Sequence, residues 1–144
     1  MGFANPPREE IDALLRRART LAVVGLSADP SRTSHGVSAA MQRFGYRVIP
    51  VNPGIASALG ERAANSLTDL GSELASGEKV DIVNVFRRPE HVAAIVEECI
   101  ALGLPAIWLQ EGVVDAAAAA RARDAGLIVV MDRCIYKDRA RLVE

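Results

Sequence analysis

The stretch TLAVVGLSADPSRTSHGVSAAM, residues 20–41, decides the fold of this chain. Its first part, Leu21–Val24, is a short continuous apolar run, which predicts a strand covered on both faces of a sheet. Gly25 permits a tight turn, and several serine and threonine residues then lead into a helix expected to begin near His35–Gly36. Unpaired N–H groups and the helix dipole favour an anion at a helix start, and Arg32 adds a positive charge. The pattern is typical of a phosphate or nucleotide site.

The turn differs from the two common nucleotide-binding motifs. A dinucleotide site requires G-x-G-x-x-G, but Gly25–Pro30 reads GLSADP and keeps only the first glycine. A Walker loop is also excluded, because no G-K-[ST] follows. The alternative for this turn is an ordinary connection between a strand and a helix.

The rest of the chain alternates short apolar runs with segments of helical periodicity. A leading helix is expected after Asn5 and Pro6, which look like an N-cap and a first-turn proline. Further helices are expected at 37–44, from Pro89 onward and at 113–125, with a weak one at 67–74, and strands at 46–51, 62–64, 81–86, 106–109 and 127–131. This alternation predicts one α/β domain, residues 1–144, with a doubly wound, mostly parallel, Rossmann-like sheet flanked by helices.

Ligands of such sheets bind outside the carboxyl ends of the strands, and polar or glycine-rich segments follow four of the expected strands. These segments are Gly25-Leu26-Ser27, Asn52-Pro53, Phe86-Arg87-Arg88-Pro89 and Gln110-Glu111-Gly112. We expect them to outline one cleft. An NAD site normally has a carboxylate after the second strand, which Asn52-Pro53 cannot supply. These two residues could instead border an adenine or a phosphorylated ribose, or form a plain turn.

Charged and nucleophilic side chains of this edge each have two interpretations. Arg87 and Arg88 place guanidinium groups where anionic ligand groups would arrive, although one of them could be a solvated surface charge. Glu111 could contact a ligand or cap the next helix. Cys134 follows the last strand beside basic residues that favour a thiolate, so it is a candidate for a mixed disulfide with a ligand thiol, or else an inert cysteine. Cys99 has core spacing.

Composition excludes several classes of protein. The 144 residues carry 17 basic and 18 acidic side chains with no basic stripe, so no nucleic acid is expected. The apolar runs are too short for a membrane span, and the first residues lack a signal pattern, so we expect a soluble cytoplasmic protein. No Cys/His cluster has metal-site spacing. The two histidines lie beside no obvious nucleophile or carboxylate pair, so no catalytic residues are expected.

Taken in order, these segments resemble the stand-alone bacterial CoA-binding proteins, whose Rossmann-like domain is similar to the CoA-binding part of the succinyl-CoA synthetase α subunit. The resemblance is carried by VVGLSADPSRTSHGV, VIPVNP, VDIVNVFRRPEHV, AIWLQEGVV and AGLIVVMDRCIYKDRARL. It implies that the pyrophosphate of CoA is held by Gly25, Ser27, Arg32, His35 and Gly36. It also implies that Asn52, Pro53 and the segment Phe86, Arg87, Arg88, Pro89 border the nucleotide, and that Gln110, Glu111 and Gly112 face the pantetheine arm.

The resemblance does not extend to ligase chemistry. The synthetase works through a phosphorylated histidine from a further domain, which this sequence does not include. We therefore expect non-catalytic binding of coenzyme A or an acyl-CoA, as a sensor or carrier. Two alternatives remain, namely a small NAD(P)-dependent oxidoreductase and an interaction module in which the ligand regulates a homodimer or another protein partner.

Overall fold

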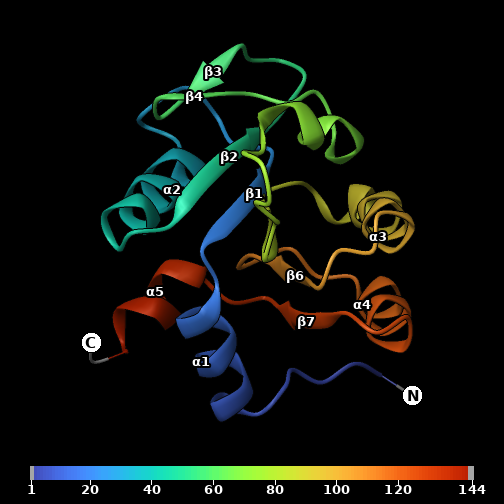
Figure 1. Ribbon diagram of the computed structural model, residues 1–144. Helices are drawn as coiled ribbons and strands as arrows, with labels where there is room; N and C mark the ends of the chain where they lie inside the picture. The colour runs from blue at the N-terminus through green and yellow to red at the C-terminus, as the bar shows by residue number, and fades with distance from the viewer. Residues whose placement is uncertain (1, 143–144) are drawn as a thin grey trace.

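A computed structural model describes residues 2–142 and contains a parallel five-stranded sheet in the order β2-β1-β5-β6-β7 (Figure 1). The strands are β1 (Thr20–Val24), β2 (Arg47–Val51), β5 (Ile82–Val85), β6 (Ala106–Leu109) and β7 (Ile128–Met131). Every pair of neighbours in this sheet is parallel, and Val24 of β1 lies opposite both Val51 and Val85. The expected Rossmann-like α/β fold is confirmed.

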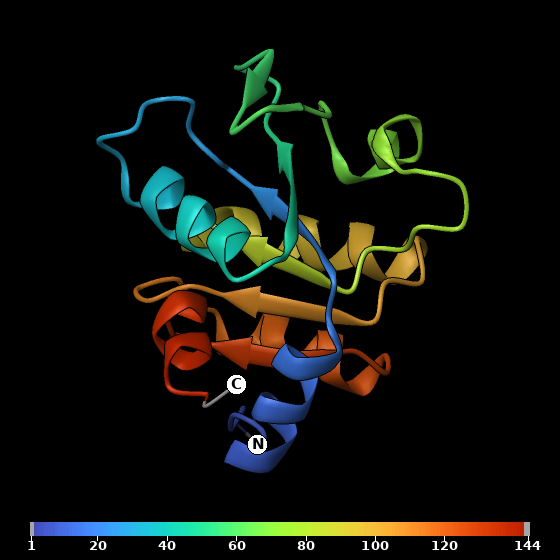
Figure 2. The same cartoon turned by 60° about the vertical axis from the view of Figure 1, so that its left-hand side comes forward.

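Helices cover both faces of the sheet (Figures 1 and 2). One face packs against α1 (Arg8–Arg17), α2 (Thr33–Arg43) and α5 (Ile135–Ala140). The other packs against the 3₁₀ helix η1 (Leu67–Glu73), α3 (Val92–Ala101) and α4 (Ala116–Asp124). A short 3₁₀ helix, η2 (Pro89–His91), leads into α3. Among the described residues, no helix has the length and apolar character that a membrane crossing requires.

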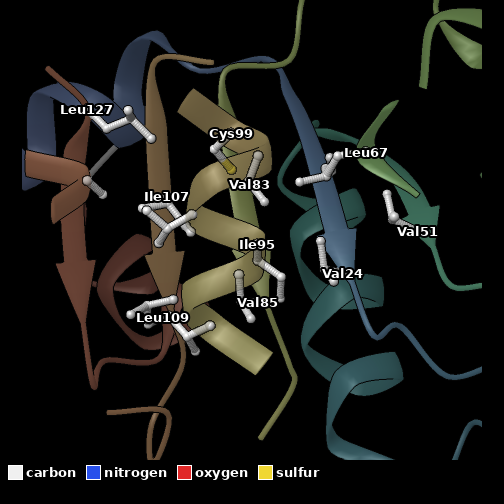
Figure 3. Packing of buried hydrophobic residues seen from close by; sticks show 14 of the residues in the cluster. Val24, Val51, Leu67, Val83, Val85, Ile95, Cys99, Ile107, Leu109 and Leu127 are labelled. Atoms are coloured by element: carbon white, nitrogen blue, oxygen red, sulfur yellow. The ribbon is translucent and has the colours of Figure 1, made fainter. Parts of the chain in front are cut away.

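Alternate residues of each strand supply two separate cores, because successive side chains point to opposite faces of a sheet. In β6, Ile107 belongs to the core under α3 and α4, whereas Trp108 belongs to the core under α1, α2 and α5. Cys99 of α3 lies in the core under α3 and α4, as its spacing predicted, and Figure 3 shows it between α3 and the sheet. The alanine-rich α4 buries three alanines against this face.

Three helix starts differ from the sequence-based expectation. Helix α2 begins at Thr33, before His35, so two hydroxyl residues open its first turn. Helix α4 begins at Ala116 rather than at residue 113, because the Asp115 side chain accepts a hydrogen bond from the backbone of Ala118 and caps the helix. Asn5 does not cap α1, since its side chain hydrogen-bonds both backbone groups of Met131 on the edge strand β7.

The remaining differences lie in the middle and at the end of the chain. In place of a single strand at 62–64, a hairpin pairs β3 (Ser57–Ala58) with β4 (Glu61–Arg62), and only Ala64 bridges to the main sheet. The segment expected to form a weak helix is a 3₁₀ helix. Helix α5 was not predicted. Its six residues are too few to show a clear helical period in the sequence.

Candidate functional site

A cleft of about 550 Å³ lies at the carboxyl ends of the strands. The chain leaves β1 toward β2 on one side and later returns to β5 on the other, so the cleft lies at the position where ligands of open α/β sheets bind. In Figure 2 the loop after β1 and the loop after β6 both lie on the left of the molecule, one above the other. The lining residues are Gly25, Ser27, Arg32, Thr33, Ser34, Phe86, Arg87, Arg88, Pro89, Gln110, Glu111, Gly112, Val113 and Cys134.

Gly25 brings the first loop against the loop after β5. Its φ of +88° is unfavourable for residues with a side chain, and a Cβ atom there would lie 2.4 Å from the carbonyl oxygen of Phe86. The N–H of Gly25 donates to the carbonyl of Val51 at 2.9 Å and so extends the sheet. Gly25 therefore shapes the floor of the cleft by its conformation, and its N–H is already used within the protein.

Hydroxyl groups hold the first loop against the start of α2. The backbone N–H of Ser27 donates to Ser34 Oγ at 3.0 Å, and Ser27 Oγ accepts from the N–H of Asp29 at 3.0 Å. Both hydroxyls act as acceptors in these bonds, so each keeps its own O–H to donate. The first turn of α2 has no side-chain cap, so its N–H groups add donors at the cleft. This end of the cleft suits an anion.

Three arginines add positive charge to the same region. Arg32 precedes α2, and Arg87 and Arg88 follow β5. Among residues 2–142 none of the three forms an ion pair. Guanidinium groups match the geometry of phosphate oxygens, so this end of the cleft has the charge and the donors to hold phosphates.

The opposite wall is formed by the loop after β6, which other elements hold in place. Gly112 has a φ of +83°, and its N–H donates to Asp132 Oδ1 at 2.8 Å. Glu111 pairs with Lys137 of α5 at 3.1 Å, and this hydrogen bond is the main cause of the raised pKa of Lys137. Gln110 is 4% exposed, and its Oε1 accepts from the N–H of Ile135 at 3.0 Å. The wall is therefore tied to both β7 and α5.

Cys134 lies at the same end of the cleft, directly before α5. It is buried and unpaired with the other cysteine. The segment around it is held by Arg133, whose guanidinium donates to both oxygens of the buried Asp138 at 2.7 and 2.8 Å. The carbonyl of Arg133 also accepts from the indole N–H of Trp108 at 2.8 Å. The thiol is thus on a rigid part of the lining.

Four residues that the sequence analysis placed at the site do not line the cleft. Asn52 braces two loops, because its Nδ2 donates to the carbonyl of Leu26 at 3.0 Å and its Oδ1 accepts from the N–H of Gly54 at 2.8 Å. Pro53 follows it in the same turn. His35 and Gly36 follow Ser34 in the first turn of α2 but do not line the cleft. All the other residues named for the site line the cleft.

The structure adds residues that sequence reasoning did not select. Thr33 and Ser34 line the cleft because α2 begins earlier than expected, although their hydroxyls in the first loop were a visible signal. Val113 adds an apolar contact. Asp132 supports the wall, and nothing in the sequence indicated that its side chain would reach Gly112.

Comparison with known proteins places this geometry in a family. A family model described as a CoA binding domain matches residues 19–140. An uncharacterized protein of Bacillus subtilis, YneT, is 45% identical over 131 residues, which cover 91% of this chain and 93% of that protein. A solved protein from Thermus thermophilus, described as cell-free ID.343, is 38% identical with a TM-score of 0.86, over 96% of this chain and all of that one.

A more distant likeness concerns the fold alone. The dinucleotide-forming acetyl-coenzyme A synthetase 1 of Ca. Korarchaeum cryptofilum is 20% identical with a TM-score of 0.66, over 83% of this chain and 28% of that one. A domain of this fold is therefore found within a larger synthetase. The family expected from the sequence segments is confirmed, since the matched model covers most of the chain: this protein belongs to the CoA-binding domain family.

Proposed function

We propose that this protein binds coenzyme A or an acyl-CoA in the cleft, and that it acts as a carrier or sensor without catalysing a reaction. The chain belongs to a CoA-binding family, and the observation that carries the proposal is the distribution of charge along its cleft. Arg32, Arg87 and Arg88 come from the loops after β1 and β5. The lining near β6 and α5 is Gln110, Gly112, Val113 and Cys134 together with Glu111, whose charge is paired with Lys137.

This distribution matches the two ends of CoA. The phosphates carry the negative charge of the molecule and would bind among the arginines and the first turn of α2. The pantetheine arm is uncharged and would extend along the loop after β6 toward Cys134. The structure thereby supports one orientation of the ligand across the sheet edge.

The state of the polar groups supports binding without catalysis. Glu111 is the carboxylate of the described lining, and it is paired with Lys137. The hydroxyls of Ser27 and Ser34 accept backbone hydrogen bonds that hold the loop. These groups stabilise the shape of the cleft instead of forming the hydrogen-bonded acid–base pair that proton transfer requires.

Calorimetric titration tests the proposal. The protein is titrated under reducing conditions with CoA, acetyl-CoA, 3′,5′-ADP, adenosine and NAD. We expect CoA and acetyl-CoA to bind more tightly than 3′,5′-ADP, because 3′,5′-ADP lacks the pantetheine arm. Adenosine should bind weakest, because it lacks the phosphates as well. Equal affinity for CoA and adenosine, or preferential binding of NAD, would contradict the proposal.

A further inference from the structure

Gln110 presents a hydrogen-bond donor to the cleft that no described residue uses. Its side-chain oxygen is identified by the bond from Ile135, since a backbone N–H can only donate and must face Oε1. The NH₂ group is therefore the other end of the carboxamide. It has no hydrogen-bond partner among residues 2–142, and it is not among the fully enclosed unpaired atoms. Because Gln110 is 96% buried and lines the cleft, this donor opens toward a ligand.

Cys134 lines the same cleft as this donor. Cys134 immediately precedes Ile135, the residue whose N–H holds the Gln110 carboxamide. Both side chains line the cleft from the segments after β6 and β7, whereas the three arginines come from the loops after β1 and β5. The pantetheine arm of CoA ends in a sulfur and carries carbonyl oxygens. At this part of the cleft a carbonyl would meet the NH₂ donor of Gln110, and the sulfur would meet the thiol of Cys134.

We propose that Cys134 forms a mixed disulfide with the sulfur of CoA while the NH₂ group of Gln110 donates a hydrogen bond to a carbonyl of the pantetheine arm. This inference rests on the proposed function, because it needs the phosphates bound at the arginine end. It assigns a covalent modification site to one of the two cysteines.

The reaction is a thiol–disulfide exchange with CoA disulfide as the oxidant. Cys134 first loses its thiol proton to solvent, and the thiolate attacks one sulfur of CoA disulfide. The new bond joins Cys134 Sγ to a CoA sulfur while the original S–S bond breaks. Cys134 is oxidised, and the departing CoA thiolate is the reduced product, which takes a proton from solvent. A reduced thiol reverses the reaction in the same way.

The surroundings of the two cysteines differ in the way that this proposal requires. Cys134 is 7% exposed and lines the cleft. Cys99 has no exposed surface, and burial raises the pKa of its thiol to about 12. Cys99 is therefore an internal control that should stay unmodified while the protein is folded.

Intact-protein mass spectrometry without reductant tests the proposal. The folded protein is incubated with CoA disulfide or, separately, with glutathione disulfide, and modified peptides are then mapped. We expect one CoA adduct on Cys134, formed about tenfold faster than the glutathione adduct, because binding raises the effective concentration of the disulfide. Cys99→Ser should keep the adduct, and Cys134→Ser should abolish it.

Gln110→Glu tests the role of the donor, and its free energy of unfolding is measured beside the wild type because the new carboxylate stands at a site that is 4% exposed. A glutamate keeps an oxygen for the N–H of Ile135 but removes the donated hydrogen bond. We expect CoA modification of Cys134 to slow about 2- to 10-fold, the size of one lost hydrogen bond, with the glutathione rate unchanged. Equal effects on both disulfides would contradict the role of Gln110.

The outcomes distinguish this inference from the proposed function. Reduced CoA that binds in calorimetry, combined with no adduct from CoA disulfide, would overturn the inference and leave the proposed function standing. An adduct on Cys99, or equal rates for both disulfides, would also overturn the inference. Absence of CoA binding would overturn both.

Discussion

Asp132 and Gly112 join two loops at the edge of the sheet through a hydrogen bond of 2.8 Å from the glycine N–H to Asp132 Oδ1. Both residues have a positive φ, +62° for Asp132 and +83° for Gly112. The N–H of Asp132 also donates to the carbonyl of Leu109 at 2.8 Å. This pair holds the wall that would face the pantetheine arm, although Asp132 itself does not line the cleft.

Replacing Asp132 should loosen that wall. Asp132→Ala removes the acceptor of the Gly112 N–H and places alanine in a left-handed conformation that costs about 1–2 kcal/mol. We expect a lower free energy of unfolding and weaker CoA binding. Asp132→Asn is the matched control, because asparagine tolerates this conformation and keeps the oxygen. Equal loss of CoA binding in both variants would show that the negative charge matters instead.

Gly25→Ala should destabilise the protein by about 2 kcal/mol or more, as measured by urea unfolding. The added Cβ would meet backbone atoms of Phe86, which cannot rotate away as a side chain can. Gly36→Ala is the control, because a Cβ there meets nothing within 4 Å and alanine favours a helix by about 0.5–1 kcal/mol. Similar destabilisation by both changes would contradict the close approach at Gly25.

Arg87→Ala and Arg88→Ala should identify the guanidinium that contacts the phosphates. Loss of a charge-assisted hydrogen bond costs about 1.5–3 kcal/mol, so at least one variant should bind CoA about tenfold more weakly or worse. Arg121→Ala is the control, because it removes an exposed ion pair between Arg121 of α4 and Glu97 of α3, which lie outside the cleft. This variant should bind CoA with unchanged affinity. Full affinity in both cleft variants would show that this loop does not bind the phosphates.

The first loop should respond to acid through Asp29. Hydrogen bonds from the backbone and then the hydroxyl of Ser31 lower the pKa of Asp29 below its ordinary value of 3.8. Because the pKa of Asp29 is lower in the folded state, its ionised form stabilises the fold at pH values above the ordinary pKa. This contribution is lost as the pH falls through the lowered pKa. We expect the stability difference between the wild type and Asp29→Asn to shrink over that range. A difference independent of pH in urea unfolding would contradict the assignment.

Asn84 should be replaceable by valine with a gain in stability. Its side chain is 1% exposed, and neither of its polar atoms has a hydrogen-bond partner in the described structure. Burying an unsatisfied amide costs about 1–3 kcal/mol, and valine favours strands. Asn84→Asp should destabilise the fold, because it would bury a charge. A loss of stability in Asn84→Val would show that the amide has a partner, such as a buried water.

The sequence predicted the strands well because each is a local pattern. Leu21–Val24 and Ala106–Leu109 are apolar runs bounded by turn residues, and both are strands within one residue of the expected bounds. Helix α5 and the hairpin were missed or misplaced, since six-residue and two-residue elements have too few positions for a period to be recognised. Residues on the first loop and after β5 and β6 were placed at the cleft because parallel strands end at one edge.

Local sequence alone determined an alternating α/β chain with polar turns after its strands, because apolar periodicity and turn residues act over a few positions. The tertiary structure decided which polar groups remain available in the cleft. Asn52 is committed to Leu26 and the Gln110 oxygen to Ile135, partners 26 and 25 residues away in the chain. Such bonds depend on how strands and helices pack, so only the folded chain distinguishes a bracing side chain from one that is open to a ligand.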